Sequence, residues 1–175
     1  MEIKKGKVIN EMKLDEKYLN MRAIEICGEW SYDRFPLVMF NPKLNGTLGQ
    51  CIYEYDPPLI ELNKSFVKLN PEGIVEKVLK HELIHTQFPQ HNKPFKKECE
   101  RRNVPYHIFL QEEIKLPAQK YIWECECGFK ITSNRNRKGI LKCPICSQYM
   151  KQRERKKKDE IININSNIKK EVNDE

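Results

Sequence analysis

The sequence predicts an α+β fold in which helices pack on a small antiparallel or mixed sheet, followed by a separate C-terminal module with four cysteines. Three observations support this prediction. In the N-terminal part, stretches with apolar residues at helical spacing surround short strand-like apolar runs. Proline and glycine separate these runs. Two close cysteine pairs then follow, at 125–127 and 143–146, with strand-like runs beside them.

The chain has 175 residues, enough for one domain of ordinary size and a small module. We expect the domain over residues 1–116 and the cysteine module over 117–150. Residues 151–175 are rich in charge and asparagine without periodicity, so we expect a disordered tail there. With 39% hydrophobic and 33% charged residues, the chain is rather polar and its core should be modest.

Targeting and redox signals favour a cytoplasmic protein. No apolar run approaches the roughly 18 residues of a membrane span, so we expect no transmembrane helix and no membrane partner. The positive charge at the N-terminus is not followed by the apolar stretch of a secretory signal. The seven cysteines are odd in number and four of them are closely paired, which favours reduced thiols and metal ligation over disulfides.

Positive charge is concentrated in the second half of the chain. Residues 1–90 contain 12 Lys and Arg against 13 Asp and Glu, whereas residues 91–175 contain 20 against 12. A basic half after a neutral half suggests a polyanionic partner, nucleic acid first, although charge that only maintains solubility is the alternative.

The N-terminal part reads as a helix followed by short strands. Apolar residues such as Tyr18, Met21 and Ile24 have helical spacing, and we expect an amphipathic helix over 14–30. Residues 35–40 form an apolar run typical of a buried strand. The runs 48–55 and 59–63, which flank a proline-rich connection, should form an antiparallel pair.

A longer helix should follow. Asn70 and Pro71 have the residue types of an N-cap and a first helical position, and apolar spacing continues to Phe88-Pro89, where proline ends the helix. A second helix over about 95–102 has a basic outer side. Residues 108–120 look like a linker with some helical content.

The longer helix contains the sequence HELIH, in which His81 and His85 lie four residues apart and therefore on one face. Glu82 lies beside this face, from where its carboxylate can reach a water on a bound ion. His91 follows after the proline bend. Neutral imidazoles as ligands, an open position for water and a carboxylate base are what zinc hydrolysis requires. The alternative is a surface helix with two solvated histidines.

The cysteine module predicts a second zinc ion. Strand-like runs at 121–123, 129–132 and 140–142 surround the two cysteine pairs, so the pairs can close on a tetrahedral ion. A module of this size has little apolar surface to bury, so a metal would be its core. The alternative is reduced thiols in a flexible segment. The expected ligands of this structural zinc are Cys125, Cys127, Cys143 and Cys146.

From the first helix to Tyr149, the chain resembles the SprT-like family of zinc metallopeptidases, which includes the DNA-dependent protease Spartan. The resemblance lies in the segment LGQCIYEY, in HELIH with the distal QHNKPF, and in YIWECECG with LKCPIC. It implies a zincin-like domain with a C-terminal zinc ribbon. It also implies His81, His85 and His91 as ligands of a catalytic zinc and Glu82 as the general base. Asn92 stands where the family commonly has glycine.

The resemblance implies a zinc-dependent endopeptidase that acts on protein substrates, with single-stranded or damaged DNA as a further partner; we expect a monomer. Tyr53, Tyr55 and Tyr106 are candidates for oxyanion stabilisation, and we expect His107 to be a surface or packing residue. The alternative function is a non-catalytic, transcription-associated zinc-ribbon protein that binds nucleic acid. Its phosphate contacts would come from the ribbon turn, at Arg135, Arg137 and Lys138.

Overall fold

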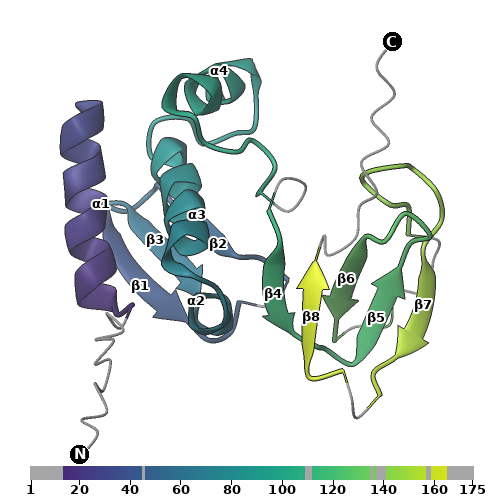
Figure 1. The fold of residues 1–175 in the computed structure, drawn as a ribbon. Coiled ribbons are helices and arrows are strands. Elements are labelled where there is room, and N and C mark those ends of the chain that lie inside the picture. Colours follow the sequence, from purple (N-terminus) through teal and green to yellow (C-terminus); the bar gives the residue numbers. More distant parts are fainter. Residues whose placement is uncertain are drawn as a thin grey trace, which may run out of the picture.

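The chain forms two units that are joined by a two-stranded sheet (Figure 1). The computed structural model describes residues 14–44, 46–108, 112–134, 136, 141–156 and 159–164. The N-terminal unit contains α1 (Glu16–Trp30), β1 (Leu37–Asn41), β2 (Gly49–Ile52), β3 (Leu59–Asn63), α2 (Lys64–Leu69), α3 (Glu72–His85) and α4 (Lys93–Arg102). The joining sheet pairs β4 (Ile114–Pro117) with β8 (Ile161–Ile164). The cysteine unit contains β5 (Tyr121–Glu124), β6 (Lys130–Ser133) and β7 (Lys151–Glu154). The α+β prediction is confirmed.

The N-terminal sheet is mixed and has the strand order β1-β3-β2. Strand β3 pairs in parallel with β1 and antiparallel with β2, which confirms the expected antiparallel pair. Successive side chains of a strand alternate between its two faces, so Ile60 and Leu62, two residues apart on β3, point to the same face. Both are fully buried. Helices α1 and α3 lie side by side over the sheet.

Helix α1 presents a different face to the core from the one that its apolar pattern suggested. Leu19, Ala23 and Ile26 are buried, whereas Met21 and Ile24 are 55% and 53% exposed. The buried residues have the i, i+4, i+7 spacing of one helical stripe, and this stripe meets the sheet. The Asp15 side chain caps the helix by accepting a hydrogen bond from the backbone N–H of Tyr18.

Helix α3 begins without the side-chain cap that the sequence predicted. Pro71 is its N-cap residue and makes no side-chain cap hydrogen bond. Asn70 instead bonds across to β4: its Nδ2 donates to the carbonyl of Lys115 and its Oδ1 accepts from the N–H of Lys115, both at 2.8 Å. Because Asn70 is buried and tied to β4, its side chain is not available to cap α3.

The C-terminal part has more regular structure than predicted. Strand β7 pairs with β5, and β8 pairs with β4, so the expected disorder from residue 151 is wrong for 151–154 and 161–164. The third strand beside β5 and β6 is therefore β7. Of the strand expected at 140–142, Ile140 lies outside the described residues, and Lys142 forms one bridge to Tyr149. The supposed linker at 108–120 contains strand β4. These pairings connect segments distant in sequence, which local patterns do not reveal.

Asn63 fixes the loop between β1 and β2. Its Oδ1 accepts from the N–H groups of Ser65 and Phe66 and so caps α2, which the sequence did not predict. Its Nδ2 donates to the carbonyls of Leu44 and Thr47 at 2.9 and 3.0 Å. One buried amide thus satisfies two helix-end donors and two loop acceptors. Among the described residues, no helix has the length and apolar character needed to cross a bilayer.

Asn63→Ala should lower the free energy of unfolding by about 2–3 kcal/mol, because it removes a helix cap and leaves two partly buried carbonyls without this partner. Urea unfolding measures this change. Thr47→Ala is the matched control in the same loop, since Thr47 is exposed, and it should change stability by less than about 0.5 kcal/mol. Equal effects of the two substitutions would contradict this role of Asn63.

Candidate metal centre and cleft

The last turns of α3 carry three buried polar side chains. His81, Glu82 and His85 are only 7%, 7% and 9% exposed. The two histidines lie on one face of the helix, as their spacing predicted, and their ring centroids are 5.1 Å apart. Burying three polar side chains at one helix end lowers the stability of the fold unless they form hydrogen bonds or bind a ligand. This cluster is therefore a candidate functional site.

His91 completes a three-histidine cluster from the loop after α3. Its Nε2 lies 3.0 Å from Nε2 of His81 and 3.1 Å from Nε2 of His85. The loop is shaped at its far end by Asn92, which is extended with φ −106° and caps α4 by accepting from the N–H of Phe95. The position after His91 therefore does not need the left-handed backbone that favours glycine.

Hydrogen bonds orient the two buried rings. Nδ1 of His81 donates to the carbonyl of Pro105, and Nδ1 of His85 donates to the carbonyl of Phe88, both at 3.1 Å. In a neutral imidazole with a proton on Nδ1, Nε2 presents a lone pair. Phe95 lies beneath the cluster, with its ring centroid 4.3–5.0 Å from those of the three histidines.

The electrostatics suit a cation. Burial lowers the pKa of His81 and of His85 to about 4, and it lowers that of His91 as well, so all three imidazoles are neutral at pH 7. Three nitrogens bound to one zinc at ~2.1 Å would lie about 3.4 Å apart, close to the separations found. The donor set therefore fits a zinc ion held by three histidines.

Glu82 is enclosed beside this cluster. Burial raises the pKa of its carboxyl to about 8. Gly49 on β2 lies against it: a Cβ added at Gly49 would be 3.0 Å from Cγ and 3.2 Å from Oε1 of Glu82. It would also be 3.0 Å from Leu62 in the core. Strand β2 can pass this close to the carboxylate only because residue 49 has no side chain.

The four expected cysteines also converge. Sγ of Cys125 lies 3.4 Å from that of Cys146, and Sγ of Cys127 lies 3.6 Å from that of Cys143. All four sulfur atoms lie within 4.8 Å of one another, and the donor set fits a tetrahedral zinc with Zn–S bonds of ~2.3 Å. Gly128, with φ 94°, makes the tight turn after the first pair, and its N–H donates to the carbonyl of Cys125.

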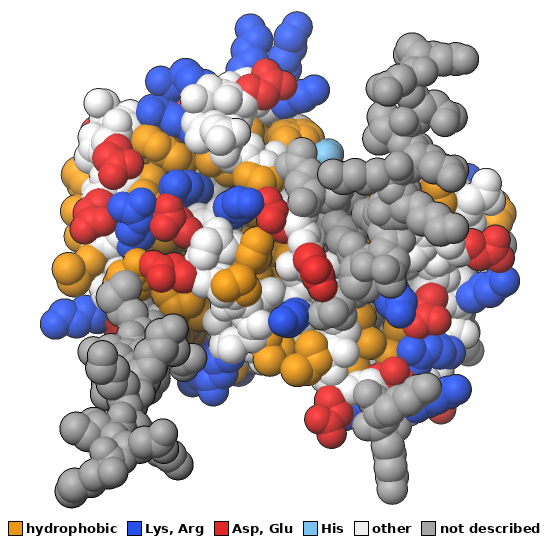
Figure 2. Space-filling model, viewed as in Figure 1, with side chains coloured by type: hydrophobic (Ala, Val, Ile, Leu, Met, Phe, Trp, Pro, Cys, Tyr) orange, Lys and Arg blue, Asp and Glu red, His pale blue; other side chains and the backbone are white. Residues whose placement is uncertain are grey.

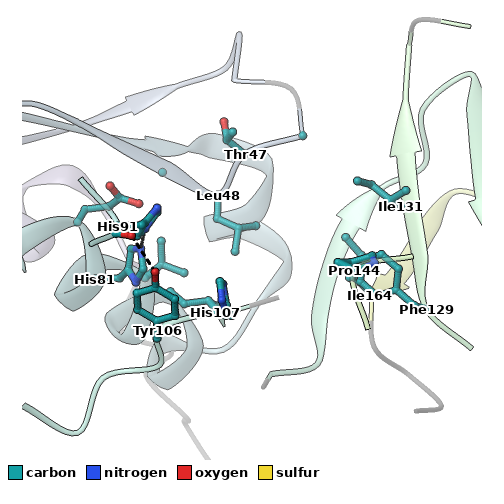
Figure 3. Close-up of a pocket in the computed structure, with 15 residues that line it drawn as sticks. Thr47, Leu48, His81, His91, Tyr106, His107, Phe129, Ile131, Pro144 and Ile164 are labelled. Atoms are coloured by element: carbon teal, nitrogen blue, oxygen red, sulfur yellow. Dashed lines mark hydrogen bonds between the residues drawn. The ribbon is translucent and has the colours of Figure 1, made fainter. Parts of the chain in front are cut away.

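A cleft of about 450 Å³ separates the three-histidine cluster from the cysteine unit (Figure 3). His81, Glu82 and His91 lie on its N-terminal side together with residues 46–49. The opposite wall comes from the cysteine unit and β8; it consists of Phe129, Ile131, Pro144 and Ile164.

Two further polar side chains line this cleft. His107, expected at the surface or in packing, is exposed, and it lines the same cleft as His81 and His91. Tyr106 also lines it, and its hydroxyl donates to the carbonyl of His91 at 3.0 Å. Tyr53 and Tyr55 are 40% and 58% exposed and are not part of the cleft lining. Arg135, Arg137 and Lys138, the expected phosphate contacts, lie outside the described residues.

Glu82→Gln should stabilise the metal-free protein at high pH. Because the folded pKa of about 8 lies above the unfolded value of about 4.5, the stabilising contribution of the protonated carboxyl is complete below pH 4.5 and is lost as pH rises through 8. The amide has no such dependence. Urea unfolding with chelator should show the variant gaining on the order of 3 kcal/mol over wild type between pH 5 and pH 9. If the difference in free energy of unfolding between variant and wild type does not change with pH, burial does not raise the pKa of Glu82.

A family match covers the segment that contains the three clustered histidines. Residues 29–112 match the sequence profile of the SprT-like family. Comparison with curated proteins gives no match. Among solved structures, the chain is similar to the crystal structure of the metallopeptidase zymogen of Pyrococcus abyssi abylysin, at 26% sequence identity and a TM-score of 0.39. That similarity covers 50% of this chain and 78% of the other. The profile match contains the whole segment from β1 to α4, including the three histidines of the cluster, so this part of the chain is similar to the SprT-like family.

Proposed function

We propose that the protein is a zinc-dependent endopeptidase of the SprT-like type that acts on DNA-associated or DNA-crosslinked proteins. The observation that carries this proposal is the enclosure of the Glu82 carboxyl beside three converging imidazole nitrogens at the wall of a cleft. A merely structural metal site needs no carboxylate of this kind. The proposed ligands of the catalytic zinc are His81, His85 and His91, and those of a structural zinc in a ribbon are the four cysteines.

In the proposed reaction, the zinc ion and the side chains of the protein have separate roles. Zinc at the three histidines would polarise the carbonyl to be cleaved and lower the pKa of the attacking water. The charge of a bound zinc would lower the raised pKa of the Glu82 carboxyl, and the ionised Glu82 would then accept the proton of that water and return it to the leaving amine. Its burial limits the contact of the carboxyl with bulk water during this transfer. The hydrogen bonds of His81 and His85 to backbone carbonyls orient both rings and fix the tautomer in which Nε2 is free to bind a metal.

The substrate backbone has a natural docking edge. Strand β2 is the last strand of its sheet, so one side of β2 carries no strand partner within the described residues. A peptide that added there as a further strand would lie beside Gly49 and so beside Glu82. Recognition would then depend on backbone groups first, which suits an enzyme acting on many proteins.

Association with DNA rests on charge. The second half of the chain carries the excess of Lys and Arg, and Figure 2 shows such side chains gathered over α4. Helix α4 follows directly after His91, which places Lys93, Lys96 and Lys97 close along the chain to the proposed zinc site. Positive charge of this kind favours phosphate contacts without sequence preference.

Glu82→Gln should abolish cleavage and leave two zinc ions bound per chain, because the substitution removes the proton acceptor but no ligand. The assay measures cleavage of a DNA-bound protein and of the chain itself, with and without single-stranded DNA, together with metal content. Glu100→Gln, an exposed residue of α4, is the matched control and should cleave normally.

A single zinc per chain, or cleavage by the Glu82→Gln variant, would refute the mechanism. Salt-dependent binding of single-stranded DNA with no cleavage by wild type would support the alternative, a non-catalytic zinc-ribbon protein that binds nucleic acid.

Gly49→Ala should lower kcat/KM by about 10- to 100-fold, because displacement of Glu82 by a fraction of an ångström to 1 Å misaligns the proton transfer. The free energy of unfolding should fall by about 1–3 kcal/mol. Gly28→Ala is the matched control, since a Cβ there meets no atom within 4 Å. If both variants retain full activity, the proximity of Gly49 to Glu82 has no catalytic significance.

A further inference from the structure

We infer that the cleft between the three-histidine cluster and the cysteine unit is a specificity pocket for a large, uncharged apolar side chain next to the cleaved bond. Its substrates are therefore extended, locally unfolded protein segments. This inference rests on the proposed function, since it assigns the substrate class of the same site.

The position of the cleft supports this role. One wall contains Glu82 and His91, so a side chain inside the cleft lies next to the reacting groups. The facing wall contains Phe129 and Ile131 from the cysteine unit and Ile164 from β8 (Figure 3). A substrate that reaches Glu82 must therefore place some of its side chains against residues from a different part of the fold.

The chemistry of the lining selects against charge. Apart from Glu82 and the histidines, the described residues that line the cleft carry no ionisable side chain other than the phenol of Tyr106. Leu48, Phe129, Ile131 and Ile164 supply apolar surface. No Lys, Arg or Asp among the described lining residues could pair with a charged substrate side chain, and burying an unpaired charge is strongly unfavourable. An apolar side chain gains from the same burial.

The walls are held in place by packing and pairing. Phe129 and Ile164 are 4% and 1% exposed, so their positions are set by the core. Ile164 pairs with Ile114 in the joining sheet, and the neighbouring Lys115 is hydrogen-bonded to Asn70 of the N-terminal unit. A preformed wall discriminates between side chains better than a mobile one, because little ordering entropy is lost on binding.

The size of the cleft defines the state of the substrate. A volume of about 450 Å³ lies in the ~300–1,000 Å³ range of pockets that enclose small ligands, and it admits a few side chains rather than a folded domain. Large apolar side chains are mostly buried in folded proteins. A segment that offers such a side chain in extended form is therefore a segment that has locally unfolded.

The test measures binding separately from cleavage. Zinc-loaded Glu82→Gln protein is titrated with peptides that are identical except for one central residue, which is Leu, Phe, Gly, Lys or Asp. We expect the Leu and Phe peptides to bind at least about 10-fold more tightly than the Lys and Asp peptides. Equal affinity across the series would overturn the inference.

A second test substitutes Ile131 in the cleft wall. Ile131 is only partly buried, so a substitution there changes the cleft more than the core. Adding Ile131→Glu should weaken the Leu peptide about 10-fold and make the Lys peptide the tighter ligand. Ile161→Glu is the matched control: Ile161 is 49% exposed on β8 and is not part of the lining, so the ranking should stay unchanged. Should Ile131→Glu fail to fold, Ile131→Thr should still reduce the preference for Leu over Gly.

The two proposals fail in different ways. Wild-type protein that cleaves all five peptides equally refutes the apolar pocket and leaves the endopeptidase intact. Apolar preference in binding, altered by Ile131→Glu, with no cleavage by wild type refutes the endopeptidase and leaves the pocket as a peptide-binding site.

Discussion

The site depends on how the protein buries two imidazoles without charging them. His81 and His85 each donate a hydrogen bond from Nδ1 to a backbone carbonyl, and Phe95 lies beneath their rings. Burial disfavours the protonated form, and the carbonyls leave Nε2 as the free nitrogen. The binding geometry is therefore imposed by helix packing and by the segments around Phe88 and Pro105, and a metal ion would enter a frame already built.

Two asparagines connect this frame to the rest of the fold. Asn63 holds the loop that precedes β2, and β2 in turn brings Gly49 against Glu82. Asn70 joins the start of α3 to β4, and through β4 to the unit that faces the cleft. In both cases a single amide uses its donor and its acceptor to connect segments that are distant in sequence. Such a position requires both groups of the amide, whereas a simple helix cap requires only the acceptor.

The sequence predicted best what depends on spacing along one element. The i, i+4 relation of His81 and His85 and the close cysteine pairs could be read directly, and both clusters assemble in the structure. It predicted poorly what depends on distant pairing. Asn70 has the residue type of an N-cap but bonds to β4, and β8 returns from the charged tail to the same strand. His107 carried no motif, and only the fold shows that it lines the cleft.

The return of β8 to β4 has a consequence for modularity. By sequence the chain looks like a peptidase-type domain with an appended metal module that could be lost or exchanged as a cassette. The polypeptide instead crosses from one unit to the other at β4 and crosses back at β8, with β5, β6 and β7 in between. A chain cut after Met150 would lose the third strand of one sheet, half of another and Ile164 from one wall of the cleft. The two units are therefore not separable at Met150, and changes in β7 or β8 should alter the cleft that faces HELIH.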